Sequence, residues 1–253
     1  MSSNTWTPAA LRSELTLWTG VLWRLVEAQH RVSTLKLVET LDEQAILEDI
    51  IEETKPGVPP DCRHLDYLLA TPFRYGAYPH GSRFRRAGRT PGVWYGSEAY
   101  GSAVAEMVFY RFLFYADSPE TPWPDGPAEF TAFSAEIRGN RLDLTATPLA
   151  RDASLWTDPV TYAACQQLAD DARDAGAEVI RYTSVRDPLR KTNAAVLSCA
   201  AFALPQPVER RTWRIRLGSF GAWALCDHPP ERVSFARDAF PDPRLSGMKW
   251  NRN

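Results

Sequence analysis

Apolar residues recur at helical spacing in the first quarter of the chain. Thr7 and Pro8 can start a helix, because proline is well tolerated in a first turn. The apolar positions that follow fit one helical face: Leu11, Leu15, Trp18, Leu22 and Leu25. A second helical pattern runs from about Leu41 to Ile51, and the segment KPGVPP at 55–60 ends it as a linker. These patterns predict a helical N-terminal extension over residues 1–60, which we expect to pack on the main domain, with partner docking as the alternative.

From residue 61 to about 230 the pattern changes between periods of two and of 3.6 residues. Alternation and β-forming residues predict strands over 129–137, 141–145, 178–182, 211–217 and 222–226, with a turn at Gly139-Asn140. Helices are predicted from about Ser102 onward and from Tyr162 to Ala175, where Gly176 ends the second one. The order lacks a regular strand–helix repeat and a glycine-rich dinucleotide fingerprint, which favours the α+β class over a doubly wound sheet. The polar tail 231–253 is expected to fray.

Composition and charge limit the classes of function. The chain has 253 residues, of which 44% are hydrophobic and 24% charged, and its formal net charge is -2. A general nucleic-acid binder is disfavoured, because contacts to phosphates need a strongly basic surface. The N-terminal residues lack a signal-peptide pattern and no apolar run approaches the length of a membrane span, so we expect a cytoplasmic protein without membrane contact.

The four cysteines lie far apart at 62, 165, 199 and 226, which favours reduced, buried thiols over a zinc site or a disulfide framework.

Segment 74–111 joins an arginine-rich loop to an apolar helix that carries one carboxylate. Glu106 is the only charged residue from Ser102 to Phe109. An unpaired buried carboxylate is costly, so Glu106 must be neutral, paired with Arg83 or Arg74, or used in chemistry. Arg83 stands in Gly81-Ser82-Arg83-Phe84, where glycine lets the backbone approach a ligand and a guanidinium can hold a phosphate through two hydrogen bonds. A solvated loop arginine is the alternative for Arg83.

Further along the chain, four residues are weaker candidates. Tyr95 ends an apolar run and could stack on a planar ring or simply pack in the core. Ser184 lies where a strand meets a turn, a usual place for a hydroxyl that positions a ligand, but it lacks the G-x-S-x-G context of a hydrolase nucleophile. Arg186 could contact a substrate or pair with Asp187, and Asn193 could cap a helix. The four histidines show no metal-binding spacing, so we expect no metal.

Taken in order, these residues resemble the RES domain, a family named for its arginine, glutamate and serine. The resemblance covers about residues 65–220 and rests on Arg74, Gly81-Ser82-Arg83-Phe84, Val93-Trp94-Tyr95, Ala105-Glu106, Leu142-Asp143-Leu144, Ile180 to Arg186, and Asn193. One departure is Gly81-Ser82-Arg83-Phe84, where the family has Gly-Gly-Arg-Trp. The first arginine of the family corresponds to Arg74 or to Arg63, and the neighbouring Tyr75 favours Arg74.

RES proteins resemble ADP-ribosyltransferase toxins in fold and are the toxins of bacterial toxin–antitoxin pairs. The resemblance implies an ADP-ribosyltransferase-like mixed β-sheet with flanking helices over residues 61–230, and NAD+ as the substrate. It also implies an Xre-type helix-turn-helix antitoxin as the partner. Cleavage of the nicotinamide–ribose bond develops oxocarbenium character that a carboxylate can stabilise. On this basis the catalytic residues are Glu106, Ser184 and Arg83, and NAD+ is bound by Arg74, Tyr75, Arg83, Tyr95, Arg186 and Asn193.

Two other functions stay open on sequence alone. ADP-ribose could pass to a target protein rather than to water, or the pocket could belong to an inactive NAD-binding or interaction module. The N-terminal extension could reshape an antitoxin-binding surface or drive self-association into a homo-oligomer.

Overall fold

An eight-stranded mixed β-sheet forms the centre of the protein. The computed structural model describes residues 6–27, 37–75 and 78–252. The strands are β1 (Thr16–Glu27), β2 (Trp94–Ser97), β3 (Ala128–Asp143), β4 (Val179–Thr183), β5 (Thr192–Val196), β6 (Glu209–Gly218), β7 (Gly221–Cys226) and β8 (Glu231–Phe235). Their order is β1-β2-β5-β4-β3-β6-β7-β8, and β3 and β4 form a parallel pair among antiparallel ones. The predicted α+β class with flanking helices is confirmed.

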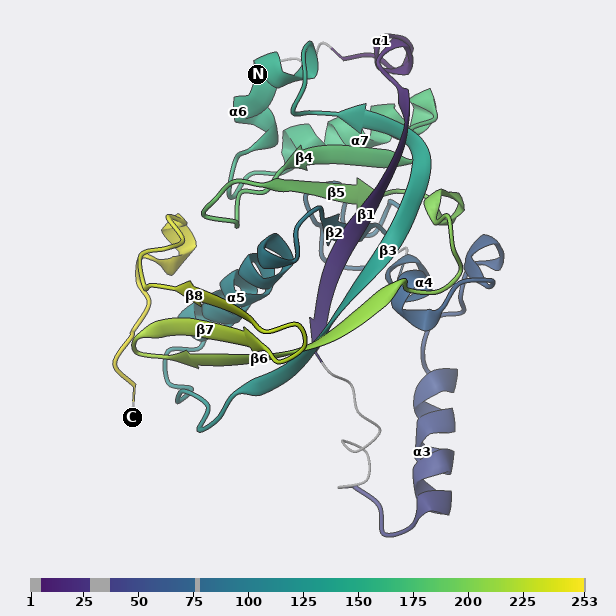
Figure 1. Ribbon diagram of the computed structural model, residues 1–253. Helices are drawn as coiled ribbons and strands as arrows, with labels where there is room; N and C mark the ends of the chain where they lie inside the picture. The colour runs from purple at the N-terminus through teal and green to yellow at the C-terminus, as the bar shows by residue number, and fades with distance from the viewer. Residues whose placement is uncertain (1–5, 28–36, 76–77, 253) are drawn as a thin grey trace.

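Strands β1 and β3 hold the sheet together. They pair antiparallel from Thr16↔Arg141 to Glu27↔Phe130, and Figure 1 shows them side by side along the length of the molecule. Because β1 also pairs with β2 through Trp23↔Ser97, the strands β1, β2, β5, β4 and β3 close into a ring. The remaining strands β6, β7 and β8 extend outward from the first half of β3. One element of the N-terminal segment is therefore a strand of the central sheet.

The prediction of a long helix from Thr7 to Leu25 is wrong. Helix α1 (Pro8–Ser13) does begin where predicted, with the Thr7 side chain accepting a hydrogen bond from the Ala10 amide, but β1 begins three residues after its end. The spacing of Leu22 and Leu25 fits a helix, yet the segment is rich in threonine, tryptophan and valine, which favour strands. Pairing with β3 makes the segment a strand and not a helix.

The other predicted helices are confirmed. Helix α3 (Leu41–Glu53) starts with a capping box made by Thr40 and Glu43. Helix α7 (Ala163–Ala175) ends at Gly176, whose φ of 91° is the left-handed conformation that glycine adopts at no steric cost. The remaining helices are α4 (Tyr67–Arg74), α5 (Tyr100–Asp117) and α6 (Ala153–Trp156), with short 3-10 turns η1 (Pro60–Cys62), η2 (Leu149–Asp152), η3 (Cys199–Ala201) and η4 (Pro243–Leu245).

Three hydrophobic clusters fix these helices to the sheet. Helix α5 packs on β3, β6 and β7 in a cluster in which Phe109, Phe112 and Trp213 are fully buried. Helix α7 and α1 cover β4 and β5, where Leu168 and Leu11 are fully buried. The third cluster places α4 on β1, β2 and β5. The described helices include none that is both long and apolar enough to cross a membrane.

Two further predictions about the chain need correction. The expected turn at Gly139-Asn140 does not form, because both residues pair with β1 inside the continuous strand β3. The tail does not fray: β8 pairs with β7, and Phe240, Leu245 and Met248 are buried against α5. Strands β1 and β8 both belong to the central sheet.

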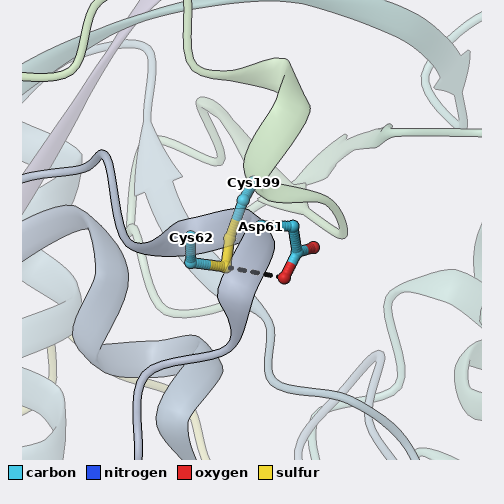
Figure 2. A group of neighbouring side chains, drawn as sticks. All are labelled: Asp61, Cys62 and Cys199. Atoms are coloured by element: carbon cyan, nitrogen blue, oxygen red, sulfur yellow. Dashed lines mark hydrogen bonds between the residues drawn. A yellow bond between two sulfur atoms is a disulfide. The ribbon is translucent and has the colours of Figure 1, made fainter.

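The expectation of reduced cysteines is also wrong for two of the four. Cys62 in η1 and Cys199 in η3 form a disulfide across 137 residues of sequence, with their Cα atoms 5.4 Å apart. Figure 2 shows the Asp61 carboxylate beside the bonded sulfurs, at 3.8 Å from Sγ of Cys62. Cys165 and Cys226 are free and buried, as predicted. The sequence spacing does not reveal the pair, because the third cluster brings η1 and η3 together only in the folded chain.

Candidate active site

A pocket of about 410 Å³ opens between β1, β2, β4, β5 and helix α5. This volume lies in the usual range for small-molecule sites. Its lining includes five of the predicted site residues: Arg83, Tyr95, Glu106, Arg186 and Asn193. Ser184 is buried behind the lining and donates a hydrogen bond to Glu106. The rest of the lining is largely aromatic or apolar, with Trp23, Tyr110, Tyr162 and Tyr182 among its members. Residues from five separate elements therefore meet around Glu106.

Glu106 projects from α5 with one carboxylate oxygen fixed and the other available. Oε1 accepts hydrogen bonds from Oγ of Ser184 at 2.6 Å and from Nδ2 of Asn193 at 2.7 Å. In the described part of the chain, Oε2 has no hydrogen-bond donor, and the side chain is partly exposed to the pocket. Burial raises the pKa of Glu106, while the two hydrogen bonds oppose the rise. Glu106 thus lines the pocket with one carboxylate oxygen held by two hydrogen bonds and the other without a donor among the described residues.

Ser184 is built to orient Glu106 and not to act as a nucleophile. It follows β4, and its Oγ accepts hydrogen bonds from the backbone amides of Arg186 at 3.2 Å and Asp187 at 3.0 Å. Because these donors occupy the lone pairs of the hydroxyl, its own proton is directed at Glu106. Asp187 also accepts a hydrogen bond from Ser102 Oγ at 2.6 Å, which ties the start of α5 to the same loop. The serine is fully buried.

Arg83 lies in the pocket wall without a carboxylate partner. Its guanidinium donates to the backbone carbonyls of Trp156 at 2.7 Å and Asp158 at 2.9 Å, and it lies over the Tyr162 ring at 4.7 Å. Among the described residues, no acid forms an ion pair with it. The carbonyl groups orient the guanidinium without neutralising it. Arg83 therefore brings a positive charge to the pocket wall near Glu106.

Arg186 reaches the pocket paired with Asp242, a carboxylate that it shares with Arg244. Its guanidinium pairs with the buried Asp242, donates to the Pro159 carbonyl, and is 2.9 Å from the Tyr162 hydroxyl. It also lies over the Phe109 ring at 4.3 Å. Asp242 belongs to the C-terminal segment, so this segment holds part of the site in place.

Tyr95, on β2, fixes the loop that carries Arg83. Its hydroxyl accepts a hydrogen bond from the Phe84 amide at 3.0 Å and is 2.8 Å from Oγ of Ser82. Burial raises the pKa of Tyr95, so the phenol is neutral at physiological pH. Its ring lines the pocket, but its hydroxyl is engaged with the loop.

Arg74 and Tyr75 are not brought to the pocket. Arg74, at the end of α4, pairs with Glu52 of α3 at 2.7 Å and donates to the Pro56 carbonyl at 2.7 Å. Tyr75 packs edge-to-face on Tyr78. Arg63, the alternative first arginine, is exposed after η1. Neither Arg74 nor Tyr75 lines the pocket, so the assignment of NAD+ binding to them has no support from their position.

The model of the RES domain family matches residues 58–218. The match covers well over half of the chain. The chain belongs to the RES domain family. One chain of the crystal structure titled M. tuberculosis MbcT-MbcA toxin-antitoxin complex is similar to it, at 13% identity and a TM-score of 0.46, covering 80% of this chain and 89% of that one. No curated protein matches the chain.

Arg24 is a pocket residue of this RES protein that the sequence analysis missed. It lies on β1, outside the matched segment, and donates to the Tyr95 carbonyl at 3.1 Å. Within the described residues no acid pairs with it, and burial lowers the pKa of its guanidinium to about 10. An arginine that is half-buried in a pocket without an ion-pair partner favours an anionic ligand. Had segment 16–27 been interpreted as a strand, Arg24 would have stood out as a charge between the apolar positions Leu22 and Leu25.

Asp242 and Tyr162 were also missed, and for a related reason. Both contact Arg186, but they come from the tail and from the start of α7. No local signal marks them, since their role depends on how distant segments pack.

The raised pKa of Glu106 predicts a pH-dependent effect of the substitution Glu106→Gln on stability. Below the ordinary pKa of the carboxyl group, the folded and unfolded chains both hold the proton and the wild type carries no penalty. As the pH rises through the ordinary and then the raised pKa, the unfolded chain ionises first, so the wild type loses stability relative to the variant. We expect Glu106→Gln to raise the free energy of unfolding by about 0.5–2 kcal/mol at pH 7, the usual size of a stabilising substitution.

Urea unfolding of both proteins at pH 7 and near pH 4 measures this difference. The gain should shrink on acidification. A variant that is less stable than the wild type at pH 7, or a gain that does not depend on pH, would show that Glu106 is not strained by burial.

Proposed function

We propose that this RES protein hydrolyses the nicotinamide–ribose bond of NAD+. The observation that carries the proposal is the state of Glu106: the residue lines the pocket, Oε1 is fixed by Ser184 and Asn193, and Oε2 accepts no hydrogen bond from the described residues. A carboxylate held in this way can stabilise positive charge that develops at a sugar carbon without reorganising during the reaction.

The arrangement of positive charge supports a pyrophosphate-containing ligand. Arg24 and Arg83 both line the pocket and neither is paired with a carboxylate among the described residues. Arg186 adds a third guanidinium, which shares the Asp242 carboxylate with Arg244. Two guanidinium groups without an ion-pair partner suit the two negative charges of a pyrophosphate, which arginine binds through directed hydrogen bonds.

The aromatic lining supports the binding of planar rings. Tyr110, Tyr162 and Tyr182 surround the pocket together with Tyr95. Burial and the nearby charge of Glu106 raise the pKa of both Tyr110 and Tyr182, so these phenols remain neutral. Neutral aromatic rings can pack against nicotinamide, whose positive charge in NAD+ is attracted to a π-face.

The reaction is a substitution at C1′ of the nicotinamide ribose. The C1′–nitrogen bond breaks, and its electron pair leaves with nicotinamide, which becomes neutral. Glu106 Oε2 stabilises the developing oxocarbenium ion, and a water oxygen then bonds to C1′. The water proton is released to Glu106 and from there to solvent, so the products are nicotinamide, ADP-ribose and one proton.

We further propose that the protein acts as the toxin of a toxin–antitoxin pair. Membership of the RES family supports this role, because depletion of NAD+ would arrest the growth of a cell. An antitoxin of the Xre type would then control the pocket, by binding across it.

Substitution of the carboxylate tests the reaction. We expect Glu106→Gln to lower the rate of nicotinamide release by about 10²–10³-fold, because an amide cannot supply the negative charge that the transition state needs. Chromatography of nicotinamide and ADP-ribose after incubation with NAD+ provides the measurement, and Glu120→Gln, which alters an exposed carboxylate, is the control.

Equal amounts of the two products would support hydrolysis. Nicotinamide without matching ADP-ribose would show transfer to an acceptor, and full turnover by Glu106→Gln would refute the role of the carboxylate. If the wild type bound NAD+ without turning it over, the inactive binding module would be the correct function.

Substitution of Arg24 tests the binding of the pyrophosphate. Calorimetric titration of NAD+ into the Glu106→Gln protein avoids turnover. In that background we expect Arg24→Gln to weaken binding by about 10- to 100-fold, since a hydrogen bond to a charged group is worth about 1.5–3 kcal/mol. Arg74→Gln is the matched control and should leave binding unchanged, because Arg74 pairs with Glu52 away from the pocket. Equal effects of the two substitutions would contradict the assignment.

A further inference from the structure

Helix α3 exposes a surface that is both acidic and apolar. Ile46 and Ile50 are 59% and 52% exposed, which is unusual for isoleucine on a 13-residue helix of a folded protein. Three exposed acids share this side of the helix: Asp42, Asp49 and Glu53. They are four or three residues from an isoleucine, so they lie beside the isoleucine pair. We call these five residues the α3 face.

The outer side of β6, β7 and β8 carries the opposite charge. Trp223 and Leu225 on β7 are 50% and 47% exposed. Three of their four cross-strand neighbours on that side are arginines: Arg216 is opposite Trp223 and Arg214 is opposite Leu225 on β6, while Arg232 is opposite Leu225 on β8. The fourth is Ser234, opposite Trp223 on β8. We call the two apolar residues and the three arginines the β7 face. The inner side of the same strands packs on α5, so the β7 face points away from the core.

The two faces match in spacing as well as in charge. Side chains four apart on a helix are separated by about 5–6 Å, and side chains two apart on a strand by about 6.6 Å. The pair Ile46 and Ile50 can therefore lie over the pair Trp223 and Leu225. The acids of the α3 face would then meet the arginines of the β7 face, on both sides of this apolar contact.

The charges on both faces are largely free to make such contacts. Among the described residues, Arg216 and Arg232 form no ion pair with an acid, and neither do Asp42, Asp49 and Glu53 with a base. Arg214 is paired with Asp227 within the chain, so it contributes less. Arg216 lies near the Phe220 ring, which stacks on Trp223 and enlarges the exposed aromatic surface.

Within one chain the faces are separate. Figure 1 shows α3 projecting from the body of the molecule, on the other side from β6, β7 and β8. Two α3 faces would repel each other, because both are acidic. We propose that the α3 face docks on the β7 face of a second copy of this chain. If the contact is made reciprocally, it forms a closed pair in which the same interface is buried twice.

Charge reversal tests this proposal. One variant carries Asp42→Arg, Asp49→Arg and Glu53→Arg, and the other carries Arg214→Glu, Arg216→Glu and Arg232→Glu. Each variant alone presents like charges at the contact, whereas a mixture offers complementary faces in both directions. All the substituted side chains are exposed, so both variants should fold. Arg151→Glu, an exposed charge reversal on η2, is the control.

Light scattering coupled to size exclusion, at tens of micromolar protein, gives the mass of each species. We expect the wild type and the control at twice the 28.5 kDa of one chain, each charge variant at the mass of one chain, and a 1:1 mixture of the variants at the double mass. A monomeric wild type would overturn the proposal and leave the surfaces to a different partner. The proposal would also be overturned if either charge variant alone kept the mass of two chains, or if the mixture of variants stayed monomeric.

Discussion

The hydrogen bond from Ser184 to Glu106 is the contact on which the candidate site depends. It joins the loop after β4 to the middle of α5 at 2.6 Å, and Ser184 itself is fully buried. Two backbone amides occupy the serine oxygen, so the direction of its proton is fixed before any ligand binds. Asn193 holds the same carboxylate oxygen from β5. The carboxylate is thus preorganised by three elements, at the cost of burying a charge that water would stabilise better.

The rest of the fold keeps that carboxylate in a pocket that is rich in arginine. Strand β1 closes the ring of strands by pairing with β2 and β3, and in doing so it adds Arg24 to the wall. The C-terminal segment packs on α5 and buries Asp242 against Arg186. Both segments lie outside the stretch that matches the family, so the pocket of this protein is completed by its own N- and C-terminal regions.

Much of the site could be predicted from sequence, because its residues carry local signals. Glu106 stands out as one charge among apolar neighbours, and Arg83, Ser184 and Asn193 follow in an order typical of the family; the structure brings all four to one pocket. Arg74 had no such local distinction beyond its tyrosine neighbour, and it pairs with Glu52 instead.

The features that escaped prediction depend on long-range packing. The spacing of Leu22 and Leu25 fits a helix as well as it fits the strand that β3 imposes. The pairing of Cys62 with Cys199 and the burial of the tail follow from contacts between segments that are distant in sequence. Hydrophobic periodicity reports the local environment of a residue, so it cannot reveal such partners.

The dependence of nicotinamide release on pH, compared between the wild type and Ser184→Ala, tests the central claim most directly. The rate should rise with pH as Glu106 ionises, because only the carboxylate stabilises the transition state. Loss of the serine removes a hydrogen bond that lowers the pKa of Glu106, so the rise should move to higher pH in the variant. If the wild type releases no nicotinamide, or if the rise occurs at the same pH in both proteins, Glu106 held by Ser184 is not the catalytic carboxylate.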